Sequence, residues 1–266
     1  MSLSLNPPPL TVDRLAVHFT TPTGERLGAL GPLSFQVQEG EFVCVLGPSG
    51  CGKSTLVRVL AGLLRPSAGT ALLSGQPIDR PSPHVGMMFQ EASLLPWRST
   101  LDNIALPLEL KGVSRLERQT QAARLLPILE HEGYEALYPA QLSGGMRQRV
   151  ALGRVLIQQP EVLLLDEPFG ALDALTRETL RDDLLRIWAA YRQTVVMVTH
   201  DIHEAVLLAD RVIVLTKRPG RISEEISISF SRPRRPDLVY SPEFGAVAQR
   251  IRAAIDTASV GLTPKG

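Results

Sequence analysis

Apolar residues near the amino end of the chain alternate with polar or small residues, which is the pattern of half-buried β-strands. Two such stretches lie on either side of a turn signal at residues 21–24, and a second turn signal follows at residues 39–40. The alternating apolar positions are Leu15, Val17, Phe19, Leu33, Phe35 and Val37. The pattern predicts an amino-terminal β-subdomain with antiparallel strands.

Further along, short runs are almost wholly apolar, as in strands buried on both faces of a sheet. These runs are residues 42–46, 162–165, 194–198 and 211–215. Helical patterns lie between them at residues 55–64 and 176–191, and the second has one apolar stripe. That stripe comprises Leu180, Leu184, Ile187, Trp188 and Tyr191. Strands that alternate with helices predict an α/β fold with a mostly parallel sheet and flanking helices.

The middle of the chain has a different character. Residues 91–140 lack runs of β-branched residues and contain several helical stretches. The expected breaks between these stretches are Pro96, Pro107, Gly112, Pro127 and Gly133. We therefore expect a helical subdomain, at about residues 91–158, inserted into a main domain that spans residues 10–245. We expect a last helix near residues 243–257. Outside the main domain we place a C-terminal helix and tail at residues 246–266.

Composition narrows the class of protein. The chain has 266 residues and a formal net charge of +1, so no overall charge points to nucleic acid as a partner. Two cysteines, Cys44 and Cys51, are too few for a disulfide framework. No apolar run approaches the roughly 20 residues of a membrane-spanning helix, and residues 1–9 lack the features of a secretory signal. We expect a cytoplasmic, reduced protein.

The apolar run at residues 42–46 leads directly into a phosphate-binding loop pattern, G-x-x-x-x-G-K-[ST]. Its glycines allow successive N–H groups to face a phosphate, and the following helix presents its positive end to the same anion. Lysine supplies charge to the β- and γ-phosphates, and the serine hydroxyl can bind Mg²⁺. The candidate residues are Gly47, Pro48, Ser49, Gly50, Cys51, Gly52, Lys53, Ser54 and Thr55.

Two further segments carry candidate chemistry. The strand at residues 162–165 ends in Asp166 and Glu167, which could hold a metal and activate a water; by themselves they could also cap a helix or line a solvated turn. Ser143 precedes Gly144 and Gly145 at a predicted helix start, where each glycine costs about 1 kcal/mol relative to alanine. Bare N–H groups at a helix start form a second anion site, although a flexible hinge would also use glycines.

With these motifs the chain resembles the ATP-binding subunit of an ABC transporter over roughly residues 11–257. The motifs follow the family's order: Walker A at 47–54, Gln90 in the Q-loop, the signature at 142–146, Walker B and the catalytic glutamate at 163–167, the D-loop at 171–173, and the switch histidine His200. The resemblance implies a P-loop NTPase core that uses ATP and Mg²⁺, with Ser54, Gln90 and Asp166 near the metal.

The resemblance also implies that two subunits sandwich two ATP molecules. Walker A of one chain would face Ser143–Gly145 of the other, and Asp173 would order the interface between them. Gln90 would sense Mg²⁺ and the attacking water, while His200 would contact the γ-phosphate. Both residues follow apolar runs, at residues 85–89 and 195–199, so we expect them at strand ends, where sites of α/β proteins gather.

Segments at residues 91–97, 199–205 and 209–222 are similar to the nitrate, sulfonate, taurine and bicarbonate importer group. This implies peripheral attachment to the cytoplasmic face of the membrane, an integral permease, an extracytoplasmic solute-binding protein and no nucleic acid. Residues 94–110 would meet the permease. The rival class, an ABC ATPase acting on nucleic acid or ribosomes, typically has two cassettes, whereas this chain has one phosphate loop. The solute, and homodimer against heterodimer, stay open.

Three features have competing interpretations. Phe19 could stack on adenine, as the resemblance implies, or could be a core residue beside Leu15 and Val17. Cys51 lies near a helix start, which can lower a thiol pKa, or it is a tolerated small residue whose reactivity is incidental. In either case we expect maleimide to label it without nucleotide and ATP to protect it. Arginines within residues 232–235 could touch anionic lipid or form a solvated turn.

Overall fold

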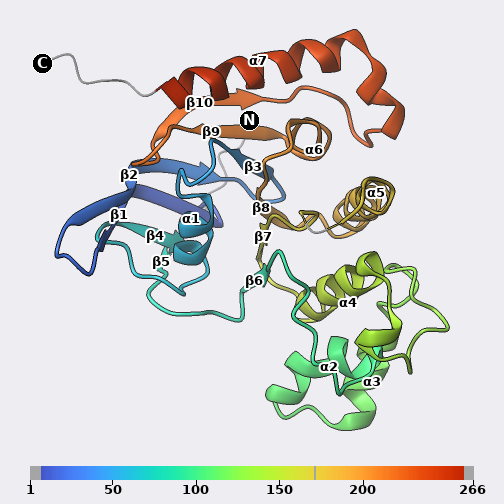
Figure 1. Cartoon of the computed structure of the whole chain (residues 1–266). Coiled ribbons are helices and arrows are strands. Elements are labelled where there is room, and N and C mark those ends of the chain that lie inside the picture. The colour runs from blue at the N-terminus through green and yellow to red at the C-terminus, as the bar shows by residue number, and fades with distance from the viewer. Residues whose placement is uncertain (1–6, 171, 261–266) are drawn as a thin grey trace, which may run out of the picture. The chain divides into compact units, whose positions relative to one another are not determined.

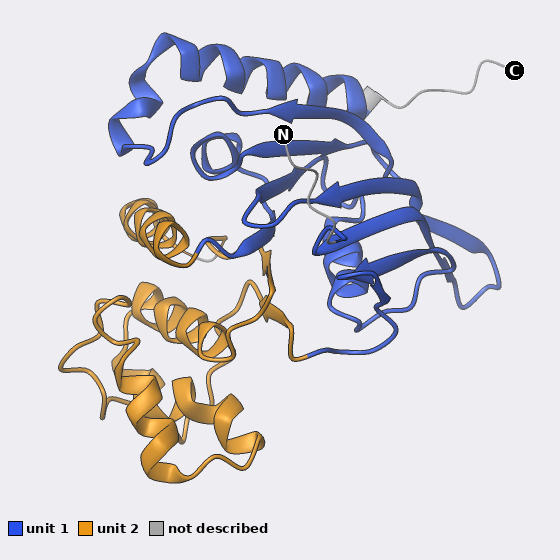
Figure 2. Cartoon of the chain, turned by 180° about the vertical axis from the view of Figure 1, so that it is seen from behind, with its two compact units in different colours: residues 1–82, 192–266 blue, residues 83–191 orange. Residues whose placement is uncertain are grey.

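The computed structural model describes residues 7–170 and 172–260, and the chain forms two compact units (Figures 1 and 2). The first unit takes its residues from 1–82 and 192–266, and the second unit is residues 83–191. Residues 1–6, Ala171 of the expected D-loop and the last six residues of the expected tail lie outside the described residues. In the described part, no helix is both long and apolar enough to cross a membrane.

The first unit contains an antiparallel sheet of strands in the order β2-β1-β4-β5. Their bounds are β1 (Leu10–Thr20), β2 (Arg26–Val37), β4 (Ala68–Leu73) and β5 (Gln76–Pro77). In β2 the predicted alternation holds, because Leu33, Phe35 and Val37 are buried and the residues between them are exposed. The expected amino-terminal antiparallel subdomain is confirmed.

Strand β1 departs from the predicted alternation. Its pairing with β2 shifts register between Val12 and Leu15, between Leu15 and Val17, and between Val17 and His18. Each shift is a bulge or irregularity that re-aims the following side chains. As a result three consecutive residues, Leu15 to Val17, are buried, whereas Phe19 is 42% exposed. The interpretation of Phe19 as a core residue is therefore wrong.

The first unit also contains the parallel strands of the α/β pattern, β9-β3-β8, with β10 antiparallel to β9. The bounds are β3 (Phe42–Leu46), β8 (Thr194–Val198), β9 (Arg211–Leu215) and β10 (Ile222–Ser227). Every residue of β3 and β8 is buried, as predicted for strands covered on both faces. The helical elements are α1 (Lys53–Leu60), α6 (Ile202–Leu208), η2 (Pro236–Tyr240) and α7 (Pro242–Val260), and α6 packs on β3 while α7 packs on β9 (Figure 1).

The second unit pairs two parallel strands with helices. Strand β6 (Val85–Met88) pairs with β7 (Val162–Asp166) from Val85–Val162 to Met88–Leu165. Its helical elements are α2 (Thr100–Leu110), α3 (Arg115–Ala123), η1 (Pro139–Gln141), α4 (Gly144–Leu156) and α5 (Ala174–Tyr191). Helix α2 packs on α3 and α4, and α4 packs on β6. The helical character predicted for the middle of the chain is confirmed.

Three predicted details of helices are wrong. Helix α1 ends at Leu60, before the predicted end at residue 64, because Gly62 takes a left-handed conformation with φ of 71° and donates its N–H to Val59 O. Pro107 lies inside α2 instead of breaking it, and the helix continues to Leu110. Tyr191 leaves the buried stripe of α5 and is 48% exposed, because it is the last residue of the helix.

Candidate functional site

The phosphate-binding loop connects buried strand β3 to helix α1, which is the context that its sequence requires. Gly52, the residue before α1, has φ of 107°, a conformation that residues with a side chain rarely adopt. A Cβ atom at Gly52 would lie 2.5 Å from Leu30 Cδ2 and 2.7 Å from Ala29 O. The loop can therefore follow this tight path only with glycine at position 52.

Lys53 is folded back over this loop. Its Nζ donates to Gly47 O at 2.9 Å and to Pro48 O at 3.4 Å, and the residue is only 8% exposed. The first turn of α1 contains no acidic residue, and Ser54 is exposed there. A buried ammonium, a glycine cradle and the positive end of a helix make a site that fits a phosphate group.

The loop rests on the turn that follows β9. Arg218 Nε donates to Gly50 O at 2.7 Å, and Gly220 exchanges backbone hydrogen bonds with Ala29 and Gly31. A Cβ atom at Gly220 would overlap Cys51 O. This turn therefore supports the underside of the phosphate loop, a role that no motif in the sequence indicated.

Cys51 does not have the environment of a reactive thiol. Its side chain is fully buried, and burial raises its pKa, although the nearby Lys53 ammonium acts in the opposite direction. The nucleophile is the thiolate, so a raised pKa lowers reactivity at neutral pH. The lowered pKa and the maleimide labelling that we expected for Cys51 are not supported. Cys44 and Cys51 are both free and buried.

His200 follows β8 in the first unit and is exposed. The turn that carries it is held by polar contacts on either side. Thr199 Oγ1 donates to Glu204 Oε2 at 2.5 Å and accepts from Asp201 N at 3.0 Å. Asp201 Oδ1 in turn accepts from the N–H groups of His203 and Glu204 at the start of α6. The predicted position of His200 at a strand end is confirmed.

In the second unit, Gln90 and Glu167 lie next to one another. A Cβ atom at Gly170 would be 2.9 Å from Gln90 Nε2 and 3.5 Å from Glu167 Oε2, so both polar groups face the same small space. Asp166 is the last residue of β7 and Glu167 follows it with φ of 47°. Few non-glycine residues have positive φ, and such strain often marks functional sites.

The signature segment packs on the start of α5. Ser143 caps α4, with its Oγ accepting from Met146 N at 3.2 Å, as predicted. A Cβ atom at Gly145 would lie 2.5 Å from Thr176 Cγ2, so glycine permits close packing there. Thr176 also donates to both carboxylate oxygens of Asp173, at 2.6 Å from Oγ1 and 3.1 Å from N. These bonds hold the pKa of Asp173 below its ordinary value.

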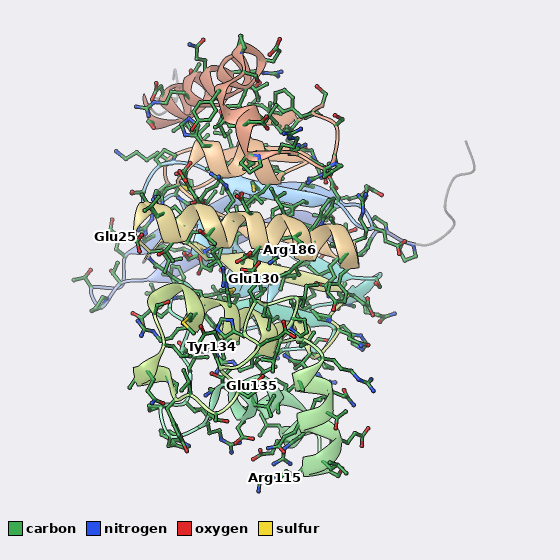
Figure 3. All side chains as sticks on the ribbon, turned by 90° about the vertical axis from the view of Figure 1, so that its right-hand side faces the viewer. Glu25, Arg115, Glu130, Tyr134, Glu135 and Arg186 are labelled. Atoms are coloured by element: carbon green, nitrogen blue, oxygen red, sulfur yellow. The ribbon has the colours of Figure 1, made fainter. Side chains whose placement is uncertain are left out.

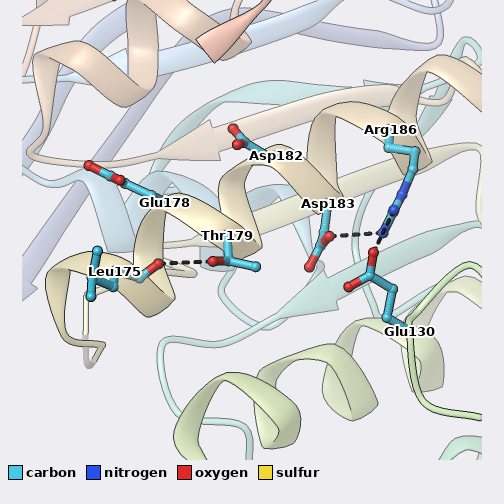
Figure 4. Close-up of a pocket in the computed structure, with 7 residues that line it drawn as sticks. All are labelled: Glu130, Leu175, Glu178, Thr179, Asp182, Asp183 and Arg186. Atoms are coloured by element: carbon cyan, nitrogen blue, oxygen red, sulfur yellow. Dashed lines mark hydrogen bonds and ion pairs between the residues drawn. The ribbon is translucent and has the colours of Figure 1, made fainter. Parts of the chain in front are cut away.

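An ion-pair network centred on the buried Asp183 ties α4 to α5, and sequence reasoning missed it. Arg149 Nε donates to Asp183 Oδ2 at 2.7 Å. Arg186 Nη2 donates to Asp183 Oδ1 at 2.8 Å and Arg186 Nη1 donates to Glu130 at 2.6 Å (Figure 4), and Figure 3 places Glu130 and Arg186 in the whole molecule. The Arg186 hydrogen bond lowers the pKa of Glu130. Glu130, Asp183 and Arg186 border a pocket of about 510 Å³ that Leu175, Glu178, Thr179 and Asp182 also line. Both guanidinium groups are committed to the network, which fixes the two helices.

The arginines after β10 serve the first unit as structural residues. Arg234 is buried and donates to the main-chain oxygens of Val206, Leu207 and Ala209 at the end of α6. Arg232 donates to Asp210 Oδ1 at 2.8 Å. The expectation of a solvated turn is wrong for these two residues, because their guanidinium groups satisfy carbonyl and carboxylate oxygens inside the fold.

The candidate residues thus form two groups. The phosphate loop, His200 and the exposed ring of Phe19 belong to the first unit, and Gln90, Ser143–Gly145, Asp166, Glu167 and Asp173 belong to the second. Among the residues that the structure describes, no cluster of three or more His, Cys, Asp or Glu side chains could hold a metal.

Comparisons with known sequences agree with the motifs. A profile described as ABC transporter matches residues 30–170. The chain is 50% identical over 225 residues to an uncharacterised ABC transporter ATP-binding protein of Methanocaldococcus jannaschii, covering 85% of this chain and 84% of that one. It is 42% identical over 251 residues to a taurine import ATP-binding protein of Rhizobium johnstonii, covering 92% and 96%. It is 46% identical over 233 residues to a nitrate import ATP-binding protein of Synechococcus elongatus, covering 86% and 85%.

Solved structures resemble the fold as well. A dimeric structure of a bacterial ABC transporter cassette has a TM-score of 0.73 and 31% identity, and covers 84% of this chain and 100% of that one. A dimeric post-hydrolysis cassette bound to ADP and Pi has a TM-score of 0.72 with the same identity and coverage. These likenesses confirm the fold class predicted from the sequence, a P-loop NTPase core with antiparallel and helical additions.

Proposed function

The chain belongs to the ABC transporter family, and we propose that it is the ATP-binding and ATP-hydrolysing subunit that energises a membrane importer of a small solute. The observation that carries this proposal is the phosphate loop itself. Lys53 is held over a glycine cradle at the start of α1, and the three-dimensional arrangement matches the anion site that the sequence requires. Relatives that match most of the chain are named as import ATP-binding proteins.

For nucleotide binding, we assign the phosphates of ATP to the loop from Gly47 to Thr55. Lys53 contributes charge, and the loop N–H groups contribute hydrogen bonds. Adenine stacks on Phe19, whose ring is exposed in this structure and therefore accessible to a base. The positive φ angles of Gly47, Gly50 and Gly52 are conformations that glycine adopts without strain, so the loop can turn its N–H groups toward the phosphates.

For hydrolysis, we assign Asp166, Ser54 and Gln90 to Mg²⁺, and Glu167 to the water. Mg²⁺ neutralises charge that develops on the phosphates. Glu167 orients the attacking water and accepts its proton, with the Gln90 amide beside it at Gly170. His200 contacts the γ-phosphate from the turn that Thr199 and Asp201 hold.

For assembly, we propose that a second ATPase subunit completes each site. The similar solved cassettes are dimeric. Ser143, Gly144 and Gly145 present the start of α4 to the ATP bound by the partner, and Asp173 helps to order the interface. The N–H groups at the start of α4 suit a phosphate group for the same reason as those of α1.

For transport, we propose a small anionic or sulfur- or nitrogen-containing solute, since similar proteins are named for taurine and nitrate import. An integral permease and an extracytoplasmic solute-binding protein complete the importer, and this subunit lies on the cytoplasmic face of the membrane. Residues 94–110, which include the exposed Trp97 and Leu110, are the segment that we assign to the permease contact.

The experiment is an ATPase assay on the wild type and on Glu167→Gln, a change that keeps the side-chain shape and removes the basic carboxylate. ATP should still bind, and hydrolysis should fall by about 10²- to 10⁴-fold, the scale of general-base assistance. Because unhydrolysed ATP keeps the two subunits closed, size exclusion with ATP should give twice the monomer mass. Near wild-type turnover by Glu167→Gln would remove it from the catalytic step.

A further inference from the structure

The loop that carries Gln90 is held by side chains from a helix that begins far away in the sequence. Gln148 Nε2 donates to Gln90 O at 2.7 Å, across 58 residues of chain. Arg154 donates to two further carbonyls of the same loop, from Nη2 to Ala92 O at 2.8 Å and from Nη1 to Ser93 O at 3.0 Å. Both side chains belong to α4, so one helix fixes three carbonyls of the loop.

The burial of Gln148 limits which side chains can take its place. Gln148 is 3% exposed, and its Oε1 atom is buried without a hydrogen-bond partner among the described residues. A buried amide with one unsatisfied atom destabilises the fold relative to an apolar side chain of the same shape. Its bond to Gln90 O therefore gives position 148 a role that an apolar residue could not fill. Arg154 is also substantially desolvated, which lowers its pKa.

The far end of the loop is fixed independently. Asn103 of α2 is buried, accepts from Leu95 N at 2.9 Å and donates to the main-chain oxygens of Leu95, Arg98 and Ser99. Loss of the α4 contacts would thus release residues 90–93 while residues 95–99 stay anchored. The freed segment is the one that places the Gln90 amide beside Glu167 Oε2, at the space occupied by Gly170.

We propose that Gln148 and Arg154 are positioning residues that fix Gln90 against Glu167 and thereby tie the catalytic carboxylate to the signature helix. The first turn of α4 is the Ser143–Gly145 segment, and the same rigid helix carries Gln148 less than two turns further on. A displacement of α4 at its signature end therefore moves the Gln90 main chain. The catalytic consequence rests on the proposed function. The clamp itself, meaning the hydrogen bonds from Gln148 and Arg154 to the carbonyls of the Gln90 loop, does not.

The clamp is tested without nucleotide by millisecond hydrogen exchange of peptides covering residues 89–95. Gln148→Met keeps the length of the side chain and removes the donor, and Gln121→Met, whose amide contacts only its own helix at Glu117, is the matched control. Exchange of the loop should be about fivefold faster in Gln148→Met, the scale of one net hydrogen bond, and unchanged in the control. Unchanged exchange in Gln148→Met would overturn the clamp.

Catalytic positioning is tested by a double-mutant cycle with Gln90→Ala. Gln148→Met should lower kcat about fivefold with KM for ATP within twofold of the wild type, and should lower it no further in the Gln90→Ala background. If the two substitutions lower kcat by independent factors that multiply in the double variant, or if only KM changes, the positioning role is overturned. If Gln148→Met does not fold, Arg154→Lys, which keeps the charge but reaches fewer carbonyls, enters the same two tests. Absence of ATPase activity in the wild type would instead overturn the proposed function, with the exchange result unaffected.

Discussion

The ammonium nitrogen of Lys53 lies 2.9 Å from the main-chain oxygen of Gly47, at the opposite end of the phosphate loop. The lysine thus closes the loop on itself through its own side chain, and it is 8% exposed there. A charge held in this way needs little rearrangement to meet an incoming phosphate. Its neighbours in the loop are glycines and small residues, so no other side chain of the loop carries a full charge.

Lys53→Ala should therefore weaken ATP binding roughly 10- to 150-fold, because hydrogen bonds to charged groups contribute about 1.5–3 kcal/mol each. Titration with a fluorescent ATP analogue measures the change. Lys111→Ala is the matched control, since Lys111 is an exposed lysine that follows α2, and its affinity should equal that of the wild type. Wild-type affinity in Lys53→Ala would exclude Lys53 from the phosphate site.

Cys51 should resist alkylation in the native protein at neutral pH, with or without ATP. Its side chain is fully buried, and burial raises its pKa, so little thiolate is present. Mass spectrometry of maleimide-treated peptides measures the labelling, and the unfolded protein, in which Cys44 and Cys51 should both react, is the control. Rapid labelling of Cys51 in the nucleotide-free native protein would contradict this environment.

Local pattern predicted the buried strands well and the bulged strand poorly. Strands β3, β8 and β9 were found from their sequence because a strand covered on both faces leaves no place for polar residues. In β1 the outcome depends on the partner. Arg14, with φ of 45°, donates its N–H to Ser34 Oγ within the first register shift, and further shifts follow up to His18, directly before the exposed Phe19. No local alternation contains that information.

In the candidate site, as in the fold, local sequence predicted some residues, and residues that act through distant partners were missed. Motif spacing predicted roles for Lys53, Glu167 and Gln90 because the proposed chemistry demands particular residue types, and these roles stay predictions. Gln148 and Arg154 escaped notice because their partners are main-chain oxygens, which have no sequence signature. The available signal was weak: two long polar side chains on a helix whose neighbouring residues, such as Ala151 and Val155, are buried.

Gly220→Ala should destabilise the first unit and weaken ATP binding together. The new methyl group would overlap Cys51 O, a backbone atom that cannot move without moving the phosphate loop. Overpacking of this kind costs roughly 1–3 kcal/mol. Urea denaturation and nucleotide titration measure the two effects. Gly245→Ala in α7 is the control, because nothing lies within 4 Å of its added Cβ; it should be neutral or slightly stabilising.

Asp173 should titrate below its ordinary pKa of about 4, because Thr176 donates two hydrogen bonds to the charged carboxylate. A group whose pKa is lowered by folding stabilises the fold above its unfolded pKa, and this contribution is lost as pH falls through the folded value. Thr176→Val keeps the methyl group that packs near Gly145 and removes the hydroxyl donor. NMR titration should show a higher Asp173 pKa in that variant; an equal value would mean that the hydroxyl bond has no such effect.

Ser143→Arg should separate ATP binding from hydrolysis. If the start of α4 completes a site on the partner subunit, a large charged side chain at position 143 obstructs closure of the two subunits, while the phosphate loop of the same chain is unaltered. ATP affinity of the single subunit should stay within about twofold of the wild type, and hydrolysis should fall to the background of the assay.

The substitution also removes a helix cap, which costs about 1 kcal/mol. Ser114→Arg removes the equivalent cap of α3, where Ser114 Oγ accepts from Glu117 N, and so controls for that loss. Ser114→Arg should hydrolyse ATP normally. Normal hydrolysis by Ser143→Arg would instead mean that the signature segment does not complete a partner's site.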